Sequence, residues 1–419
     1  MSPYLALRGG ACRFSTAASK PVTISQTKNK LRNVYNPDEA LKIYSSFTAA
    51  NDVTVSPAST RYVQQLTVRR LAKSQRFSDI KNFLESHKSQ PQITDEPFLS
   101  SLIRSYGVAG MFENAVNTYI EMTDLGTPRT PLSFNTLLSA CIDSKVFDRV
   151  PVYFYEFPAK FGFQPDKYSY GILLKAYCEM GSPETAMEKL KEMEEKGIEI
   201  GAISFTTILH TLYKKGSINE AEKFWDDMVT KKGVVPDVGS YNVRLSHIQG
   251  GKPETLTGLI EEMVNGGIKP DPVSYNYLIT CYFTNGMVDD AMKVYTDDLL
   301  KVKGHNPNSA TFRTLVFNLC KKGRFMTGYK VFKESVRVRK IPDFNTLKYL
   351  VEGLVKKGHG AEAKAMIRTM NKKFSPELLV AWGKITEELG LSPVEVEEVD
   401  SGEIEKGVDS LETKKASTS

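Results

Sequence analysis

Cysteine is scarce in this sequence, with five residues among 419, and no two of them form a C-x-x-C pair. A small secreted scaffold held together by disulfides is therefore excluded. Long apolar runs are missing as well: no stretch of 18 apolar residues occurs, so we predict no transmembrane helix and no membrane insertion. The remaining composition, 41% hydrophobic and 25% charged residues, is typical of a globular chain.

Motifs that carry catalysis or hold a metal are also missing. The five histidines share no cluster and no H-x-E or H-E-x-x-H pattern, which argues against a zinc site and against a deaminase. Neither a P-loop nor a Rossmann glycine motif is present. We therefore predict no enzyme activity, no catalytic residue, no metal and no cofactor.

Charge is unevenly distributed along the chain, whose net charge is +6. Residues 1–36 contain no acid and combine arginine and lysine with serine and threonine, so we predict a mitochondrial transit peptide there. A chloroplast transit peptide is the second choice, and a disordered basic tail is the alternative to both. The last 29 residues carry eight acids against three lysines, which predicts a disordered acidic tail over 391–419.

A repeated pattern runs through the middle of the chain. A proline followed by an acid or asparagine recurs at intervals of 34 to 37 residues, with one double interval of 71. A glycine near the middle of each interval is followed, five residues later, by a small residue. The prolines are Pro165, Pro236, Pro270, Pro307, Pro342 and Pro376, and the glycines are Gly110, Gly181, Gly216, Gly286, Gly323 and Gly358.

These markers divide residues 61–377 into nine units. Each unit is predicted to be a pair of helices, because apolar residues recur at helical spacing around the glycine. A half-repeat with its connection is expected over 37–60 and a capping helix over 378–390. One hairpin cannot bury its apolar face alone, so we expect an all-α stack. The units are 61–95, 96–130, 131–166, 167–201, 202–237, 238–271, 272–308, 309–343 and 344–377.

Local signals mark where the first helix of each unit starts and ends. A serine or threonine at the third position is predicted to be its N-cap, which is worth about 1 kcal/mol. The mid-unit glycine is expected to adopt a left-handed conformation and to end the helix. Four cysteines, Cys141, Cys178, Cys281 and Cys320, fall within these helices and are expected to be small core residues. The predicted N-caps are Ser133, Ser169, Ser204, Ser240, Ser274, Thr311 and Thr346.

One copy of the pattern illustrates a family resemblance. Residues 273–279 read V-S-Y-N-Y-L-I, and Gly286 and Ala291 follow at the spacing described above. The pattern resembles the pentatricopeptide repeat (PPR) family over about residues 37–377, and more narrowly the short P-class proteins of plant organelles. The resemblance implies a right-handed superhelical solenoid of about nine helix-turn-helix repeats. It also implies binding of single-stranded RNA, with one base per repeat.

In the family, the fifth and last residues of a unit read a base edge, and the second residue stacks on bases. Amides, hydroxyls and carboxylates can match such an edge, and apolar stacking tolerates any base. For the asparagines the alternative is turn chemistry at a helix start. By this resemblance the base-reading residues are Asn135, Asp166, Thr206, Asp237, Asn242, Asp271, Asn276 and Asn308, and the stacking residues are Leu132, Tyr168, Ile203 and Val273.

Several units depart from the family's base-reading residues. Gly171 has no side chain to read a base, and Gln65, Arg313 and Lys348 fall outside the usual set. Only four of the nine units then resemble readers, too few to select one site among organellar transcripts. Two possibilities follow: a partner positioned by other contacts, or a place on a large ribonucleoprotein such as the mitochondrial ribosome.

Lysine pairs precede the mid-unit glycine in three units and are candidates for neutralising RNA phosphates. Cations at the C-terminal end of a helix also complement its dipole, by about 0.3–1 kcal/mol, so both explanations stay open. The pairs are Lys214 with Lys215, Lys321 with Lys322, and Lys356 with Lys357.

Three hypotheses for the function of the protein are compatible with these features. The leading hypothesis is a mitochondrial protein that binds single-stranded messenger or ribosomal RNA and acts in its processing, stability or translation. The first alternative is a PPR subunit of the mitochondrial ribosome that binds ribosomal RNA and ribosomal proteins. The second is a helical-repeat scaffold that binds proteins. Added salt should weaken RNA binding steeply but affect an apolar peptide groove little.

Overall fold

The computed structural model describes residues 23–34, 36–50, 57–300, 306–374 and 376–391. Within these ranges the chain forms 21 α-helices with short 3₁₀ and π segments and no strand, which confirms the all-α prediction. None of the described helices is both long and apolar enough to cross a membrane. Most of the predicted transit peptide and nearly all of the acidic tail lie outside the described residues.

The chain divides into two compact units, Met1–Val243 and Arg244–Ser419. The boundary falls within α13 (Val238–Ile248). The other helices of the first unit are α1 (Ile24–Asn33), α2 (Pro37–Ala50), α3 (Pro57–Lys73), α4 (Phe77–Glu85), α5 (Glu96–Val108), α6 (Phe112–Ile120), α7 (Pro131–Asp143), α8 (Arg149–Phe161), α9 (Lys167–Glu179), α10 (Pro183–Glu195), α11 (Ala202–Lys215) and α12 (Ile218–Asp226). Those of the second unit are α14 (Pro253–Asn265), α15 (Pro272–Thr284), α16 (Val288–Lys293), α17 (Ser309–Lys321), α18 (Phe325–Arg337), α19 (Phe344–Lys356), α20 (Gly360–Asn371) and α21 (Pro376–Glu388).

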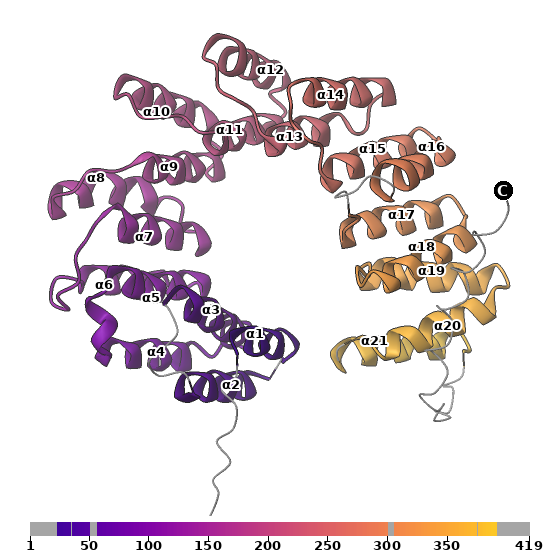
Figure 1. Cartoon of the computed structure of the whole chain (residues 1–419), viewed down its shortest axis with the longest axis horizontal. Helices are drawn as coiled ribbons and strands as arrows, with labels where there is room; N and C mark the ends of the chain where they lie inside the picture. The colour runs from indigo at the N-terminus through magenta and orange to yellow at the C-terminus, as the bar shows by residue number, and fades with distance from the viewer. Residues whose placement is uncertain (1–22, 35, 51–56, 301–305, 375, 392–419) are drawn as a thin grey trace, which may run out of the picture. The chain divides into compact units, whose positions relative to one another are not determined.

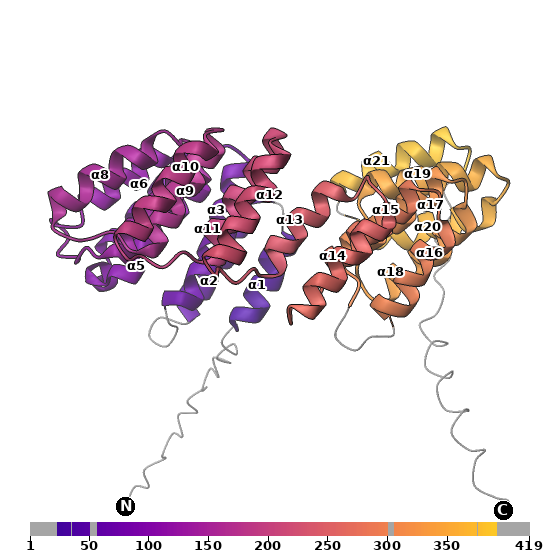
Figure 2. The same cartoon turned by 90° about the horizontal axis from the view of Figure 1, so that it is seen from above.

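Within each unit the helices pair into hairpins that stack in two layers (Figure 1). In the first unit α5, α7, α9 and α11 contact one another in sequence, and we call them the A helices. The B helices α6, α8 and α10 each contact the A helix before them and the A helix after them. In the second unit α15, α17 and α19 form the corresponding A layer (Figure 2). Stacking therefore buries the apolar face that a single hairpin would leave exposed.

The A helices begin where the repeat pattern predicts. α5, α7, α9 and α11 start at the first residue of their predicted units, and so do α13, α15, α17 and α19. α3 differs, because it begins at Pro57 rather than at residue 61. Proline suits the first turn of a helix, where its missing N–H is not needed, so the helix extends back to it.

A residue just beyond the end of most A helices has a left-handed backbone, with α13 as an exception. Gly110, Gly181 and Gly216 have φ between 74° and 82° there, as the sequence predicts. Gln75 and Lys145 occupy the same position in their units with φ of 55° and 60°. In a residue other than glycine, Cβ comes too close to the following carbonyl oxygen in this conformation, which costs about 1–2 kcal/mol. The turns at Gln75 and Lys145 are therefore strained.

Helix α1 was not expected from the sequence, which assigns residues 1–36 to a transit peptide or a basic tail. Thr23 begins the helix with a capping box, in which its side chain accepts from the backbone of Gln26 and the Gln26 side chain accepts in return. Leu31 is fully buried in a cluster with Ala40, Tyr44 and neighbouring residues. α1 also contacts α2 and α3, so residues 23–34 belong to the folded array.

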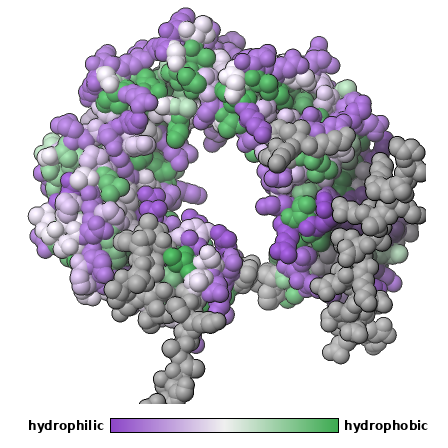
Figure 3. Space-filling model, viewed as in Figure 1, coloured by the Kyte–Doolittle hydropathy of each residue, from purple (hydrophilic) through white to green (hydrophobic). Residues whose placement is uncertain are grey.

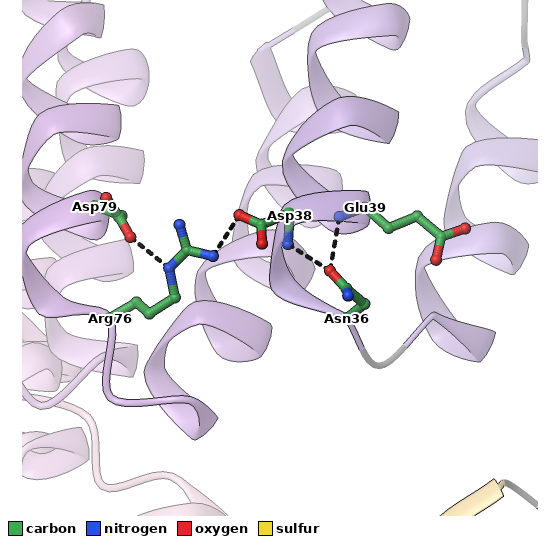
Figure 4. Close-up of polar contacts among 5 residues, drawn as sticks. All are labelled: Asn36, Asp38, Glu39, Arg76 and Asp79. Carbon is green, nitrogen blue, oxygen red and sulfur yellow. Dashed lines mark hydrogen bonds and ion pairs between the residues drawn. The ribbon is translucent and has the colours of Figure 1, made fainter.

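The start of α2 is fixed by polar contacts (Figure 4). The Asn36 side chain accepts from the backbone N–H groups of Asp38 and Glu39 at 2.9 and 3.1 Å. The Arg76 guanidinium bridges Asp38 on α2 and Asp79 on α4. These contacts join the predicted half-repeat to the first full hairpin.

The core between the two layers combines aromatic, aliphatic and small side chains. Ala115, Ala186 and Ala221 on the B helices are fully buried, as the spacing from the mid-unit glycine predicts. The space-filling view shows mainly hydrophilic residues on the visible surface, with scattered hydrophobic patches (Figure 3). The predicted core role of the cysteines is confirmed, because Cys141, Cys178, Cys281 and Cys320 are all buried and unpaired.

Candidate nucleic-acid interface

The predicted N-caps are wrong by three residues. The last residue of the preceding unit occupies the N-cap position, and the serine or threonine at the third position of the unit lies at N3. The side chain of that last residue caps most of the A helices, but Asp95 before α5 and Gly201 before α11 make no side-chain cap. The Tyr168 and Ser169 backbone N–H groups donate to Asp166 Oδ1 at 3.0 and 2.9 Å. Aspartate and asparagine cap as well as serine does, and a carboxylate also suits the positive end of the helix dipole. Side-chain N-caps of this kind are Thr130, Asp166, Asp237, Asp271, Asn308 and Asp343.

The structure brings together the predicted base-reading pair Asn135 and Asp166. The Asn135 amide donates to Asp166 Oδ1 at 3.0 Å, and Asn135 Oδ1 accepts from the Ser169 hydroxyl at 2.6 Å. An amide has two N–H groups and two lone pairs, so Asn135 keeps one donor and one acceptor for a ligand. Both side chains are half-buried, so the amide is held in one orientation while its free edge stays accessible.

Thr206 and Asp237 meet through a shared partner. The hydroxyl groups of Thr206 and Ser240 lie 2.7 Å apart, and the Ser240 backbone and hydroxyl both donate to Asp237 Oδ1 at 2.9 Å. Asp237 is exposed and Thr206 is half-buried. This pair therefore has a bridging serine, as Asn135 and Asp166 do, but lacks the direct hydrogen bond between the two readers.

The remaining predicted readers differ in accessibility. Asn276 is only 8% exposed, and its Oδ1 has no hydrogen-bond partner among the described residues. Asn308 is engaged as the N-cap of α17, where Oδ1 accepts from the backbone N–H of Thr311 at 2.9 Å. Asn242 is half-buried in α13, and Asp271 caps α15. Residues at the same position of different repeat units therefore differ in their exposure to solvent.

Three of the four predicted stacking residues are exposed at the starts of A helices. The exposed fractions of Leu132, Tyr168 and Ile203 are 49%, 64% and 76%. Val273 is half-buried at the same position of α15. Leu132 and Tyr168 each lie two residues after a side-chain N-cap, so an apolar side chain lies close to a capping oxygen at the starts of α7 and α9.

The predicted phosphate-binding lysines lie at the opposite ends of the A helices. Lys214 and Lys215 end α11, and the other two pairs occupy the last residue and the C-cap of α17 and α19. Lys215 forms an ion pair with Glu184 on α10. Lys321, Lys322, Lys356 and Lys357 are all exposed.

A groove in the second unit was missed by sequence reasoning. It has a volume of about 490 Å³ and lies along the A helices α17 and α19. Arg313 lies 3.8 Å from Asp343 there, and the rings of Phe317 and Tyr349 lie 6.0 Å apart. The signal in the sequence was the spacing of Arg313 and Phe317, which puts both side chains on one face of a helix.

Comparison with known proteins decides the family. The model of the PPR repeat family matches residues 165–214, 200–248 and 270–321, and that of the PPR repeat matches 99–127. The chain is 51% identical over 391 residues to the small ribosomal subunit protein mL103 (rPPR7) of Arabidopsis thaliana, across 90% of this chain and 93% of that protein. The chain belongs to the pentatricopeptide repeat family.

Two further comparisons extend this result. The PPR chain is 52% identical to the mitochondrial pentatricopeptide repeat-containing protein At2g18520 of Arabidopsis thaliana, across 90% of this chain and 88% of the relative. Among solved structures, PPR10 from maize is similar at 19% identity and a TM-score of 0.43, across 88% of this chain and 60% of that one. The relatives are mitochondrial, which confirms the predicted localisation, and this PPR family is not enzymatic, as predicted.

Residues that could hold a metal are scattered over the described helices of the PPR array, and the Cys320 thiol is buried. In the described part of the chain no cluster of histidine, cysteine, aspartate and glutamate could hold a metal ion. Burial raises the pKa of the Cys320 thiol to about 12, so this group is not a nucleophile at neutral pH. Membership in the PPR family supports RNA as the class of partner.

Proposed function

We propose that this protein is a component of the small subunit of the mitochondrial ribosome and binds ribosomal RNA along its A helices. The observation that carries the proposal is the 51% identity, over 90% of the chain, to a small ribosomal subunit protein. The similarity extends over 93% of that relative, so it is not limited to one or two shared repeats.

The polar groups of the A helices favour a partner held by many sequence-tolerant contacts. Asp166, Asp237 and Asn308 each use one side-chain oxygen to bind the first turn of a helix. Asn276 is nearly closed to solvent. For a ligand, each aspartate keeps its second oxygen and Asn308 keeps its amino group, and one such group alone selects weakly among base edges. An RNA that an assembly already holds in place needs little selection.

Apolar and basic side chains supply the sequence-tolerant contacts in this proposal. Tyr168 is 64% exposed, and stacking of a base on an aromatic ring contributes about 1–3 kcal/mol whichever base is present. The exposed lysines at the far ends of α17 and α19 would neutralise phosphates without reading bases.

The alternative of a factor that acts on messenger RNA rests on one observation. Asn135 is fixed by Asp166 and Ser169 and keeps a free donor and acceptor, which match the N3–H and O4 of uracil. A single well-held reader of this kind gives a preference for one base at one position. Recognition of a unique site in a messenger RNA requires base-reading residues in several consecutive repeats, which a single reader does not provide.

Crosslinking in isolated mitochondria tests the proposal. Ultraviolet crosslinking, purification of the protein and sequencing of the attached RNA should return reads from the ribosomal RNA of the small subunit. Reads confined to one or a few messenger sites would instead support the processing or translation factor. Recovery of bound proteins without RNA would support the protein-binding scaffold.

A further inference from the structure

A polar cluster lies on α3 and α5, the first helices of the first two complete units, and includes the fifth residue of each unit. Its members recur at i and i+4 on each helix, so they share one helix face, and α3 and α5 contact each other. We call it the α3–α5 cluster, and it consists of Arg61 and Gln65 on α3 and Ser100 and Arg104 on α5.

The two arginines of the cluster have no acidic partner. Neither Arg61 nor Arg104 forms an ion pair with a described residue, although Arg104 is half-buried. Burial lowers the pKa of Arg104, and the nearby charge of Arg61 lowers it further, while the exposed Asp143 opposes this only weakly. Two like charges held close without a counter-ion are unfavourable in the free protein.

Other arginines of the same segment are used differently. Arg70 donates to the backbone carbonyls of Leu31 and Arg32 at the end of α1. Arg76 bridges two aspartates. These two arginines have evident structural partners. Arg69 on α3 forms no ion pair with a described residue either, but it is exposed, whereas Arg104 is half-buried.

Neutral members of the cluster are also unsatisfied. Gln65 Nε2 and Ser100 Oγ are buried atoms with no hydrogen-bond partner among the described residues. Ser100 is only 6% exposed, so water reaches its hydroxyl poorly. Buried polar groups are nearly always paired, and an exception calls for a missing partner. The amide N–H and the two guanidinium groups donate, and the hydroxyl can donate, so an acceptor with negative charge complements the set. Arg61 is the exposed member that such an acceptor reaches first, and Arg104 is half-buried behind it.

We propose that the α3–α5 cluster binds one phosphate group of an RNA backbone. A phosphodiester offers two charged acceptor oxygens and no donor, which complements this set of groups, and arginine binds phosphate with two parallel hydrogen bonds. The cluster lies on the A helices that precede α7 and α9, where Leu132 and Tyr168 offer exposed surfaces to bases. The proposal rests on the RNA-binding function above. It gives the first two repeats a contact with the RNA backbone that does not depend on which base is present.

A double substitution with a matched control tests the site. The full chain with Arg61→Gln and Arg104→Gln should bind single-stranded RNAs of different sequence about tenfold or more weakly, by the same factor for each RNA. The slope of log affinity against log salt should flatten by about 0.7, as expected for one lost phosphate contact. The control carries Lys191→Gln and Lys223→Gln, which remove the same charge from exposed positions on the B helices α10 and α12.

Stability separates a binding role from a structural one. Without RNA, the Arg104→Gln variant should melt at the same or a higher temperature than the unmodified chain, because it removes a half-buried unpaired charge. Equal affinity and equal salt slope in the double variant and its control would overturn the proposal, as would a lower melting temperature with unchanged RNA binding. If the unmodified chain binds no RNA, both the site and the proposed function fail.

Discussion

The amide of Asn135 donates a hydrogen bond of 3.0 Å to Asp166, although the two residues belong to successive A helices. Asp166 Oδ1 also caps α9 by accepting from the backbone N–H groups of Tyr168 and Ser169. One carboxylate oxygen therefore starts a helix and orients a candidate base reader. The stability of the repeat and the geometry of the interface are coupled at this point.

Replacement of Asp166 by alanine is expected to weaken the start of α9. Loss of an N-cap lowers the free energy of unfolding by about 1 kcal/mol, and amide hydrogen exchange at Tyr168 and Ser169 should become faster. Asp166→Asn keeps an acceptor and should keep most of the protection. Identical exchange rates in the alanine variant and the unmodified chain would contradict the capping role.

Asn135 and Asn276 occupy the same position of their units, yet their substitution should have different effects. Asn135→Ala removes a fixed amide and should weaken binding of a uridine-containing RNA by about fivefold, the value of one hydrogen bond. Asn276→Ala should change binding little, since that residue is only 8% exposed. Fluorescence anisotropy with matched RNAs measures both, and a larger effect at Asn276 would refute the assignment.

Lys145→Gly is expected to stabilise the first unit by about 0.5–1 kcal/mol. Lys145 has φ of 60° at a position where most repeats have glycine, and glycine relieves the clash of Cβ in that conformation. The converse substitution, Gly110→Ala, should destabilise by a similar amount, because Gly110 has φ of 74° and no neighbour within 4 Å that a methyl group would touch. Thermal unfolding of the three chains tests the opposite signs.

Stability should fall in mild acid because of His87. His87 Nδ1 lies 2.7 Å from the Phe83 carbonyl oxygen, so it donates, and Nε2 accepts from the Tyr44 hydroxyl at 2.9 Å. Burial lowers the pKa of His87 below its ordinary value of 6.5, so the folded state binds its proton less readily than the unfolded state does. Stability is then full above this value and falls as the pH drops below it, by up to about 1.4 kcal/mol per pH unit.

Removal of the titrating group gives the control for this effect. In the His87→Gln variant, the free energy of unfolding of the first unit should depend less on pH between about 6.5 and 5 than in the unmodified chain. Parallel pH profiles for the two chains would show that another group is responsible.

The two explanations of the lysine pairs lead to different results. Lys321→Gln with Lys322→Gln should weaken binding of every RNA alike and flatten the salt dependence, because both lysines are exposed. Lys215→Gln should have a smaller effect, since Lys215 is paired with Glu184. If the lysines only complement the helix dipole, the double variant should lose about 0.3–1 kcal/mol of stability and keep the salt slope unchanged.

The fold was predictable from the sequence where glycine and small residues recur at the same position of successive repeats. Glycine at the end of an A helix and a small residue on the B helix determine where each hairpin turns and packs, and the starts of eight A helices coincide with the predicted units. α1 was missed because the absence of acids up to Asn36 indicated a leader and outweighed the helical pattern around Leu31. The N-caps were predicted three residues too late. The reason is that an aspartate before the helix and a serine within its first turn are both good capping residues.

The site was less predictable, because exposure depends on neighbouring repeats. Asn135 and Asn276 have the same place in the pattern, but only Asn135 keeps an accessible edge. The unsatisfied groups of the α3–α5 cluster become visible only when two helices are packed together. Position within a repeat gives the direction of a side chain, whereas the packing of adjacent helices decides what it can reach.

Sedimentation of a mitochondrial lysate tests the central claim most directly. With ribosomal subunits separated on a gradient, the protein should migrate with the small subunit and should move to the top of the gradient after treatment with ribonuclease. Migration as a free protein, or with messenger RNA and apart from both subunits, would contradict the account.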